Sequence, residues 1–143
     1  MNNRSVPVNT VLPHIYYRDV PAAIAWLTRV FGFREHYRYG DPANPSGAQL
    51  IAGDAYLMIA AIKGPRTPAE LGFGTQSLTI FIDDVEAHCA QSRASGAVIV
   101  EEPHETIYGE FQYAVLDLEG HHWLLSRHAK DIAPQDWGAS VKG

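Results

Sequence analysis

An arrangement of one strand, one helix and three further strands occurs twice in this chain of 143 residues. In each half, a β-branched and apolar segment (11–17 or 75–82) leads into an Asp-Val pair (Asp19-Val20 or Asp84-Val85) that opens a helical pattern. One helix covers only one face of a sheet, so the other face must meet the second module or a ligand. Repetition of a whole supersecondary unit therefore predicts an α+β fold, with two βαβββ modules forming a curved mixed sheet around a central cleft.

The first module is expected over residues 10–62. Its helix is predicted to begin at Asp19, whose carboxylate can accept hydrogen bonds from free backbone N–H groups, and to stop at Gly32 as a C-terminal cap. The segment 41–47 has the composition of a turn, and Gly53-Asp54 is a hairpin signal. The strands after the helix are expected at 33–39, 48–52 and 55–62.

A linker rich in glycine and proline, 63–74, separates the first module from the second, which is expected over 75–127. Asp83 and Glu86 have the spacing of a capping box, and the helix that follows is expected to run to about Ser95. The remaining elements of this module are strands at 97–101, 110–118 and 121–127, a loop at 103–109 and a turn at Glu119-Gly120. Residues 1–9 form an N-terminal extension and residues 128–143 a tail with Trp137, a residue type that usually packs somewhere.

Composition excludes several classes of partner. The net charge is −5 and the 11 lysines and arginines are scattered, so the basic patch of a nucleic-acid-binding protein is missing. No apolar run reaches the roughly 20 residues of a membrane span, and the first residues have no apolar core of a signal peptide. Cys89 is the one cysteine, which fits a reducing compartment. A soluble cytoplasmic protein with no membrane and no nucleic-acid partner is therefore expected.

Several short segments, in their order and spacing, resemble a known family. They are Asp19-Val20-Pro21, Val30-Phe31-Gly32-Phe33, Asp83-Asp84-Val85, Tyr108-Gly109 and Leu116 to Trp123. Over residues 10–127 the chain resembles the glyoxalase/bleomycin resistance protein/extradiol dioxygenase (vicinal oxygen chelate) superfamily. The resemblance implies the fold predicted above, a small-molecule ligand and a homodimer.

The metal site of this family's enzymes is not expected here. Those enzymes place one ligand on each of four strands, and the matching positions in this chain are Leu12, Met58, Ser77 and Leu124. Leucine cannot coordinate a cation, and a thioether is a poor ligand for Zn²⁺, Ni²⁺ or Mn²⁺. We therefore expect no metal and no other cofactor, in a glyoxalase-like branch that lacks the usual ligands.

The residues facing the cleft follow from the alternation of side chains along strands. His122, rather than His121, shares a face with Leu124. Sparse polar groups among apolar and aromatic ones are typical of a small-molecule pocket, and no arginine follows Tyr108-Gly109 to attract a phosphate. The ligand-binding residues are predicted to be His14, Tyr16, Met58, Ser77, Thr79, Phe81, Tyr108, His122 and Leu124. No catalytic residue is assigned.

Three functions remain open from the sequence. The first is a metal-independent binder of a small, largely apolar or aromatic molecule, as in sequestration of a drug or toxin. The second is an enzyme of the same fold, a lyase, isomerase or dioxygenase, with a noncanonical metal site or an acid–base site at His14 or His122. The third is an interaction module in which side chains fill the cleft. The first is preferred, because all four metal-ligand positions are lost. A filled cleft is disfavoured, because Ser77, Thr79 and the two histidines suit a sealed core poorly.

Overall fold

The computed structural model describes residues 11–143, so the predicted extension 1–9 lies outside the described residues. The chain divides into two compact units: the first ends at Gly74 and includes Leu118–Gly120, and the second comprises Thr75–Asp117 and His121–Gly143. No helix among the described residues combines the length and apolarity needed to cross a bilayer.

The elements are β1 (His14–Tyr17), α1 (Val20–Val30), β2 (Arg34–Asp41), β3 (Asn44–Ala52), β4 (Ala55–Ala61), α2 (Pro68–Leu71), β5 (Ser77–Phe81), α3 (Val85–Ala94), β6 (Val98–Glu105), β7 (Glu110–Leu116), β8 (His122–His128) and the short 3₁₀ helix η1 (Pro134–Trp137).

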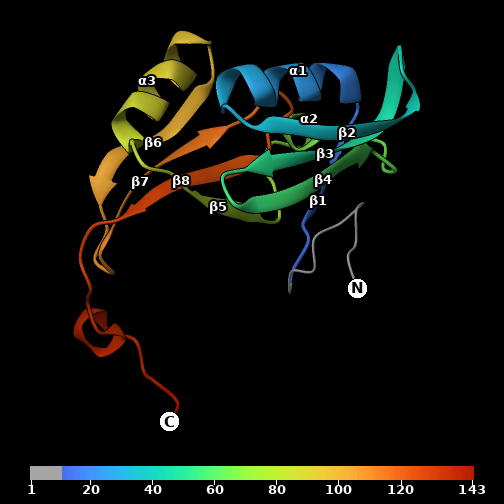
Figure 1. The fold of residues 1–143 in the computed structure, drawn as a ribbon. Coiled ribbons are helices and arrows are strands. Elements are labelled where there is room, and N and C mark those ends of the chain that lie inside the picture. The colour runs from blue at the N-terminus through green and yellow to red at the C-terminus, as the bar shows by residue number, and fades with distance from the viewer. Residues whose placement is uncertain (1–10) are drawn as a thin grey trace. The chain divides into compact units, whose positions relative to one another are not determined.

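The first unit is a four-stranded mixed sheet covered on one face by α1 (Figure 1). Its strand order is β1-β4-β3-β2, with β1 parallel to β4 and the other neighbours antiparallel. Asp19 caps α1 by accepting a 3.0 Å hydrogen bond from the N–H of Ala22, and Gly32 leaves the helix at φ +76°. The buried side chains from the sheet and the helix are chiefly Ile15, Tyr17, Leu27, Leu50, Leu57 and Ile59.

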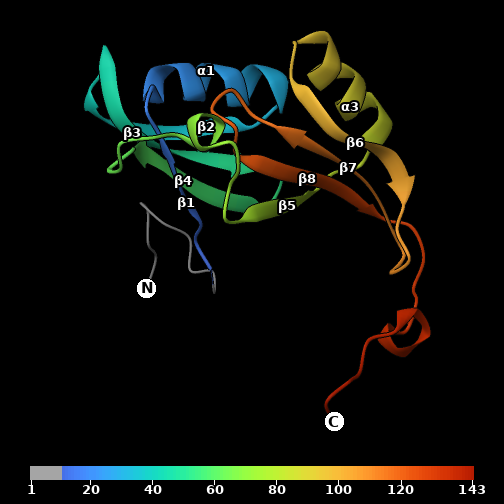
Figure 2. The ribbon, with the colours of Figure 1, turned by 180° about the vertical axis from the view of Figure 1, so that it is seen from behind.

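The second unit repeats this plan with the order β5-β8-β7-β6, and α3 lies over its sheet (Figure 2). The phenol of Tyr113, fully buried, lies 2.8 Å from Oγ of Ser92 and 2.6 Å from Nδ1 of His88, both on α3. Burial raises the pKa of this phenol, so it stays protonated at neutral pH. The predicted α+β class and the repeated βαβββ order are confirmed.

The cap of α3 differs from the prediction. The helix begins one residue later than a capping box at Asp83 and Glu86 requires, and Asp84 instead accepts a 2.9 Å hydrogen bond from the N–H of Ala87. Both aspartates are capping residues by type, and β5, which ends at Phe81, leaves room for two residues before the cap. A capping box does form at the start of α2, between Thr67 and Glu70.

One helix and two strand boundaries also differ from the sequence expectation. The segment 63–74 holds α2 and is more than a linker, and β3 begins inside the turn predicted at 41–47. The predicted loop 103–109 is shorter, because β6 keeps pairing with β7 as far as Glu105. Register shifts between Ile99 and His104 let this edge strand accommodate Pro103, which cannot donate to a ladder.

Acid should weaken the ion pair between Arg18 and Glu70 in the first unit. The Arg18 guanidinium and then the N–H of Thr67 hold the pKa of Glu70 at about 2, below its ordinary value of 4.5. Because the folded-state pKa is the lower one, the stabilisation is present above pH 4.5 and is lost as the pH falls toward 2. Glu70→Gln should therefore flatten the pH dependence of the free energy of unfolding between pH 6 and pH 3, measured in urea.

The matched control for this prediction is Glu86→Gln, which changes an exposed glutamate in the first turn of α3. It should follow the wild-type pH dependence. An unchanged slope for Glu70→Gln would contradict a stabilising ion pair between Arg18 and Glu70, and high salt should reduce the wild-type slope.

Candidate functional site

In the first unit, a polar and aromatic cluster surrounds Met58 on the sheet face opposite to the buried Leu57 and Ile59. The Met58 sulfur accepts a hydrogen bond from Nε2 of Gln49 at 3.4 Å and one from the phenol of Tyr37 at 3.7 Å. Burial, and then the neighbouring Tyr39, raise the pKa of the Tyr37 phenol, so it remains a donor at neutral pH.

Three of the predicted ligand residues lie on this same face of the first unit. His14 is the register partner of Met58, and Tyr16 is the partner of Ala60. His14 and Tyr16 are exposed, whereas Ile15 between them is buried. The predicted alternation of side chains along β1 therefore places His14 and Tyr16 on the same face, as the structure shows.

Three polar residues of this cluster, Tyr37, Gln49 and His36, are not among those predicted to bind a ligand. Gln49 is fully buried, and its Oε1 lies 2.5 Å from Nδ1 of His36. His36 lies at a register shift between β2 and β3, where an extra residue re-aims the side chain. Its ring also contacts Tyr56, with the centroids 6.0 Å apart.

In the second unit, the other predicted residues gather on two parallel strands. Ser77 pairs with His122, Thr79 with Leu124 and Phe81 with Ser126 across β5 and β8. The intervening side chains, including Ile80, Trp123 and Leu125, point to the opposite face and are buried, and α3 packs against β7 and β8. Phe81 is 63% exposed, so its ring is available to a ligand.

His122 carries an unusual feature of this face. Its Nδ1 atom is buried and has no hydrogen-bond partner among residues 11–143. A buried polar nitrogen without a partner costs about 1–3 kcal/mol. A rotation of the imidazole ring would present this nitrogen to a polar group of a ligand without breaking a hydrogen bond to the described residues.

Tyr108, in the loop between β6 and β7, is connected to the same sheet by a short hydrogen-bond chain. Its phenol oxygen accepts a 3.1 Å hydrogen bond from Nε2 of Gln112, and Oε1 of Gln112 accepts one from Oγ of Ser126 at 3.3 Å. The Tyr108 ring packs edge-on against Trp137, with a centroid distance of 5.8 Å. Alternation along β7 was a sufficient signal for Gln112, but no local pattern indicated the contact with Trp137.

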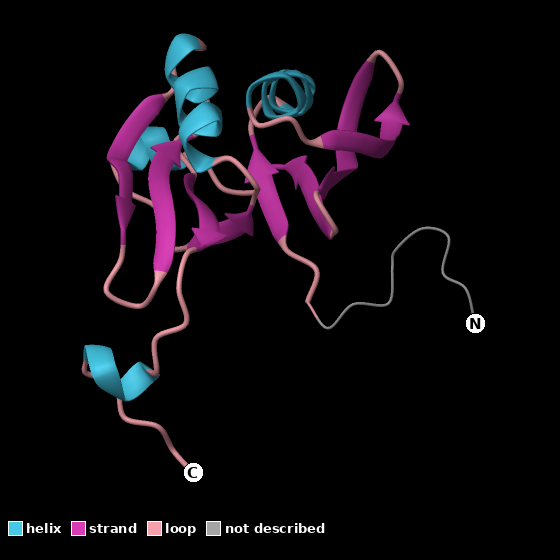
Figure 3. Ribbon diagram, turned by 60° about the vertical axis from the view of Figure 1, so that its left-hand side comes forward, coloured by secondary structure: helices cyan, strands magenta, loops and turns pink. Residues whose placement is uncertain are grey.

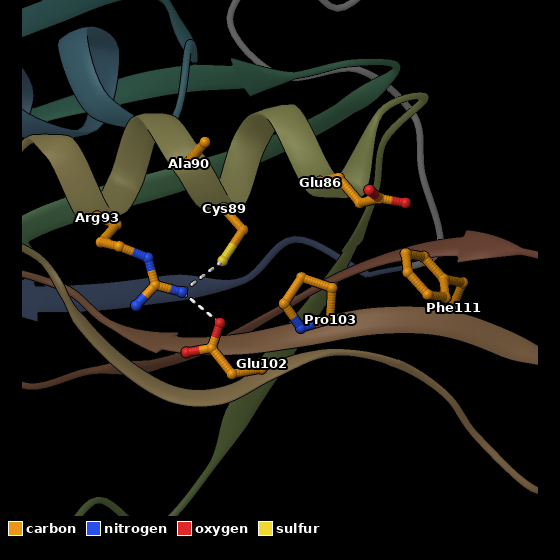
Figure 4. Close-up of a pocket in the computed structure, with 7 residues that line it drawn as sticks. All are labelled: Glu86, Cys89, Ala90, Arg93, Glu102, Pro103 and Phe111. Atoms are coloured by element: carbon orange, nitrogen blue, oxygen red, sulfur yellow. Dashed lines mark hydrogen bonds and ion pairs between the residues drawn. The ribbon is translucent and has the colours of Figure 1, made fainter.

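A separate groove of about 380 Å³ lies between α3 and the strands β6 and β7 (Figure 4). Its lining residues are Glu86, Cys89, Ala90, Arg93, Glu102, Pro103 and Phe111. Arg93 forms an ion pair with Glu102, and its guanidinium also donates to the Cys89 sulfur at 3.8 Å. Burial raises the pKa of the Cys89 thiol, so at neutral pH it is protonated and a weak nucleophile.

The four positions matching the family's metal ligands lie before or on strands in both units. Leu12 precedes β1, whereas Met58, Ser77 and Leu124 lie on β4, β5 and β8. Within the part of the chain that the structure describes, no group of three or more His, Cys, Asp or Glu side chains is placed to hold a metal ion. The expectations of a metal-free protein and of a cleft between the modules stay predictions.

Comparisons with known proteins agree with this architecture. The chain is 32% identical to TioX from Micromonospora sp. ML1, over 87% of this chain and all of that one, with a TM-score of 0.70. A bleomycin resistance determinant encoded on the transposon Tn5 has the same fold, at 21% identity, with 85% of this chain and 98% of that chain covered and a TM-score of 0.66. An uncharacterised protein of Mycobacterium bovis is 23% identical over 84% of both chains.

A family model covers most of the chain. The model that matches residues 8–125 is described as the Glyoxalase/Bleomycin resistance protein/Dioxygenase superfamily. This range includes the first βαβββ repeat, the second repeat as far as Leu125 in β8, and all nine residues predicted to bind a ligand. The chain therefore belongs to the Glyoxalase/Bleomycin resistance protein/Dioxygenase superfamily.

Proposed function

We propose that this protein binds a small, largely apolar or aromatic molecule without a metal ion, on the sheet faces that the helices leave uncovered. The observation that carries the proposal is Nδ1 of His122, a buried nitrogen that has no partner within residues 11–143. It lies on the same face as Leu124 and Phe81, so an orienting polar group adjoins apolar surface.

The chemistry of the neighbouring residues supports an uncharged ligand. Thr79 contributes a hydroxyl and a methyl group to the β5–β8 face, Leu124 an aliphatic group and Phe81 an aromatic ring, and none of them carries a charge. A phosphate or carboxylate ligand would instead require arginine, lysine or a helix N-terminus in contact with it. An aromatic ring with one hydrogen-bonding group is the ligand that suits these side chains best.

The biological setting that we propose follows the family. Sequestration of a drug or toxin is the proposed use, because the family includes bleomycin resistance proteins. A homodimer is proposed for the same reason. A cytoplasmic location is proposed from the single cysteine, which excludes an intrachain disulfide.

Binding of acridone, a neutral fluorescent tricyclic molecule, provides the test. Wild-type protein should bind it saturably in a fluorescence titration, and the affinity should be unchanged after dialysis against EDTA. His122→Ala and Phe81→Ala should each weaken binding about tenfold, because they remove one hydrogen bond or one aromatic contact.

Phe73→Ala is the matched control, since Phe73 is 62% exposed and belongs to the first unit. It should bind acridone as the wild type does. The proposal fails if wild-type protein shows no saturable binding. It also fails if protein purified without a histidine tag holds stoichiometric metal by plasma mass spectrometry and loses binding when that metal is removed.

A metal-free acid–base enzyme is the second candidate, and the same nitrogen of His122 favours it. An imidazole nitrogen without a protein partner can accept a proton from a substrate. The two candidates differ in the fate of the ligand, because a binding protein releases it unchanged. Incubation with a β,γ-unsaturated cyclic ketone distinguishes them: conversion to the conjugated isomer, which needs only a proton taken from the α-carbon and returned to the γ-carbon, supports the enzyme.

A further inference from the structure

The backbone of residues 129–130 is fixed to the loop between β6 and β7. The N–H groups of Ala129 and Lys130 both donate to the carbonyl of Gly109, at 2.9 and 3.0 Å. Gly109 has φ +94°, and a Cβ at this position would lie 2.1 Å from the carbonyl oxygen of Lys130. Glycine is therefore required for the chain to pass so close to the loop.

The segment then turns through η1, the short helix near the C-terminus in Figure 3. The ring of Trp137, in η1, lies 5.8 Å from that of Tyr108 between centroids. Gly138 ends η1 in the left-handed conformation and donates to the carbonyl of Gln135 at 3.3 Å. Both aromatic side chains remain well exposed, Trp137 at 37% and Tyr108 at 40%. Residues 129–130 are held against Gly109, and the edge-on contact with Tyr108 places the Trp137 indole beside this loop.

The aromatic pair continues the proposed ligand face of the second unit. Tyr108 is joined through Gln112 to Ser126, which is the register partner of Phe81. Gln112 and Ser126 are nearly buried, whereas Phe81 is exposed. Because β5 and β7 are separated only by β8, about 10 Å of sheet lies between their backbones. The exposed rings of Phe81 and Tyr108 therefore lie on either side of the hydrogen-bonded pair formed by Gln112 and Ser126.

We propose that Trp137, paired with Tyr108, is a ligand-contacting residue that stacks on a planar aromatic ring bound to the face of β5, β8 and β7. This inference rests on the proposed function and adds to it a site residue on the tail. Large aromatic side chains held in a fixed position lose little conformational entropy on binding, which is why they dominate recognition surfaces.

Acridone titrations of three variants test the proposal. Trp137→Ala should weaken binding about tenfold, as expected for loss of one stacking partner, and Trp137→Phe should recover most of that loss. Phe73→Ala should bind as the wild type does. Circular dichroism and the Tm should stay at wild-type values in all three, because the changed side chains are exposed.

A second measurement reports contact directly. The chain has three tryptophans, and the indole N–H resonance of Trp137 is assigned by its loss in Trp137→Phe. On addition of acridone this resonance should shift through the ring current of the ligand, whereas that of the buried Trp123 should move much less.

The outcomes separate the two proposals. Absence of binding by the wild type overturns the proposed function and this inference together. Binding that is weakened by Phe81→Ala and His122→Ala but not by Trp137→Ala, with an unshifted Trp137 resonance, overturns only the role of Trp137. Weakened binding with a shifted resonance supports both.

Discussion

Replacing Asp117 by alanine is expected to lower the free energy of unfolding by about 2–4 kcal/mol, because two donors lose a charged acceptor. The Oδ2 atom of Asp117 accepts a 3.0 Å hydrogen bond from the indole N–H of Trp123, a side chain that is 1% exposed. Its Oδ1 atom accepts a 3.0 Å bond from the backbone N–H of His121. Removing the carboxylate therefore leaves a buried indole N–H without this acceptor and loosens the turn between β7 and β8.

Urea unfolding at neutral pH, followed by far-UV circular dichroism, measures the loss. Asp117→Asn should be less harmful, because its amide oxygen can still accept one of the two hydrogen bonds. Asp83→Ala is the matched control: Asp83 is exposed and does not cap α3, so its change should stay within about 0.5 kcal/mol. Equal stability of Asp117→Ala and Asp83→Ala would contradict the structural role assigned to Asp117.

The local rules of strands and helices were enough to predict most of the fold. Asp19 and Gly32 mark the ends of the first helical region because capping depends on a few neighbouring residues. Alternation placed His14 and Tyr16 on one face of β1, because the strand period does not depend on distant contacts. The error at Asp83 has the same origin, since two adjacent aspartates satisfy the local rule equally well.

Contacts between distant residues set the limits of that approach. The spacing of Thr67 and Glu70 is a local capping signal, but the ion pair of Glu70 with Arg18 joins positions 52 residues apart. The contact of His36 with Gln49 depends on a register shift, which alternation cannot anticipate. Trp137 reaches Tyr108 only because the chain returns across Gly109. Candidate-site residues supplied by alternation were therefore predictable, and those supplied by bulges and returning segments were not.

Glu119 gives the second large expected effect, and it too depends on distant residues. Its carboxylate accepts hydrogen bonds from the backbone N–H of Arg18 at 2.6 Å and of Asp19 at 2.9 Å, next to the N-terminus of α1. The residue is 9% exposed, so these donors lie in a region of limited solvent access. A negative charge at this end of the helix also interacts favourably with the helix dipole. Glu119→Ala is expected to lower the free energy of unfolding by about 2–4 kcal/mol in urea.

A local measurement separates this role from a general loss of packing. The amide protons of Arg18 and Asp19 should exchange with solvent much faster in Glu119→Ala than in the wild type, beyond the change in global stability, because their acceptor is gone. Glu119→Gln keeps the shape and one acceptor oxygen, so its loss should be intermediate. Glu102→Ala is the control, because its ion pair with Arg93 is exposed and such pairs stabilise little. Unchanged exchange at Arg18 and Asp19 in Glu119→Ala would show that the turn between β7 and β8 does not hold the start of α1, and that the sequence expectation of a simple Glu119-Gly120 turn is sufficient.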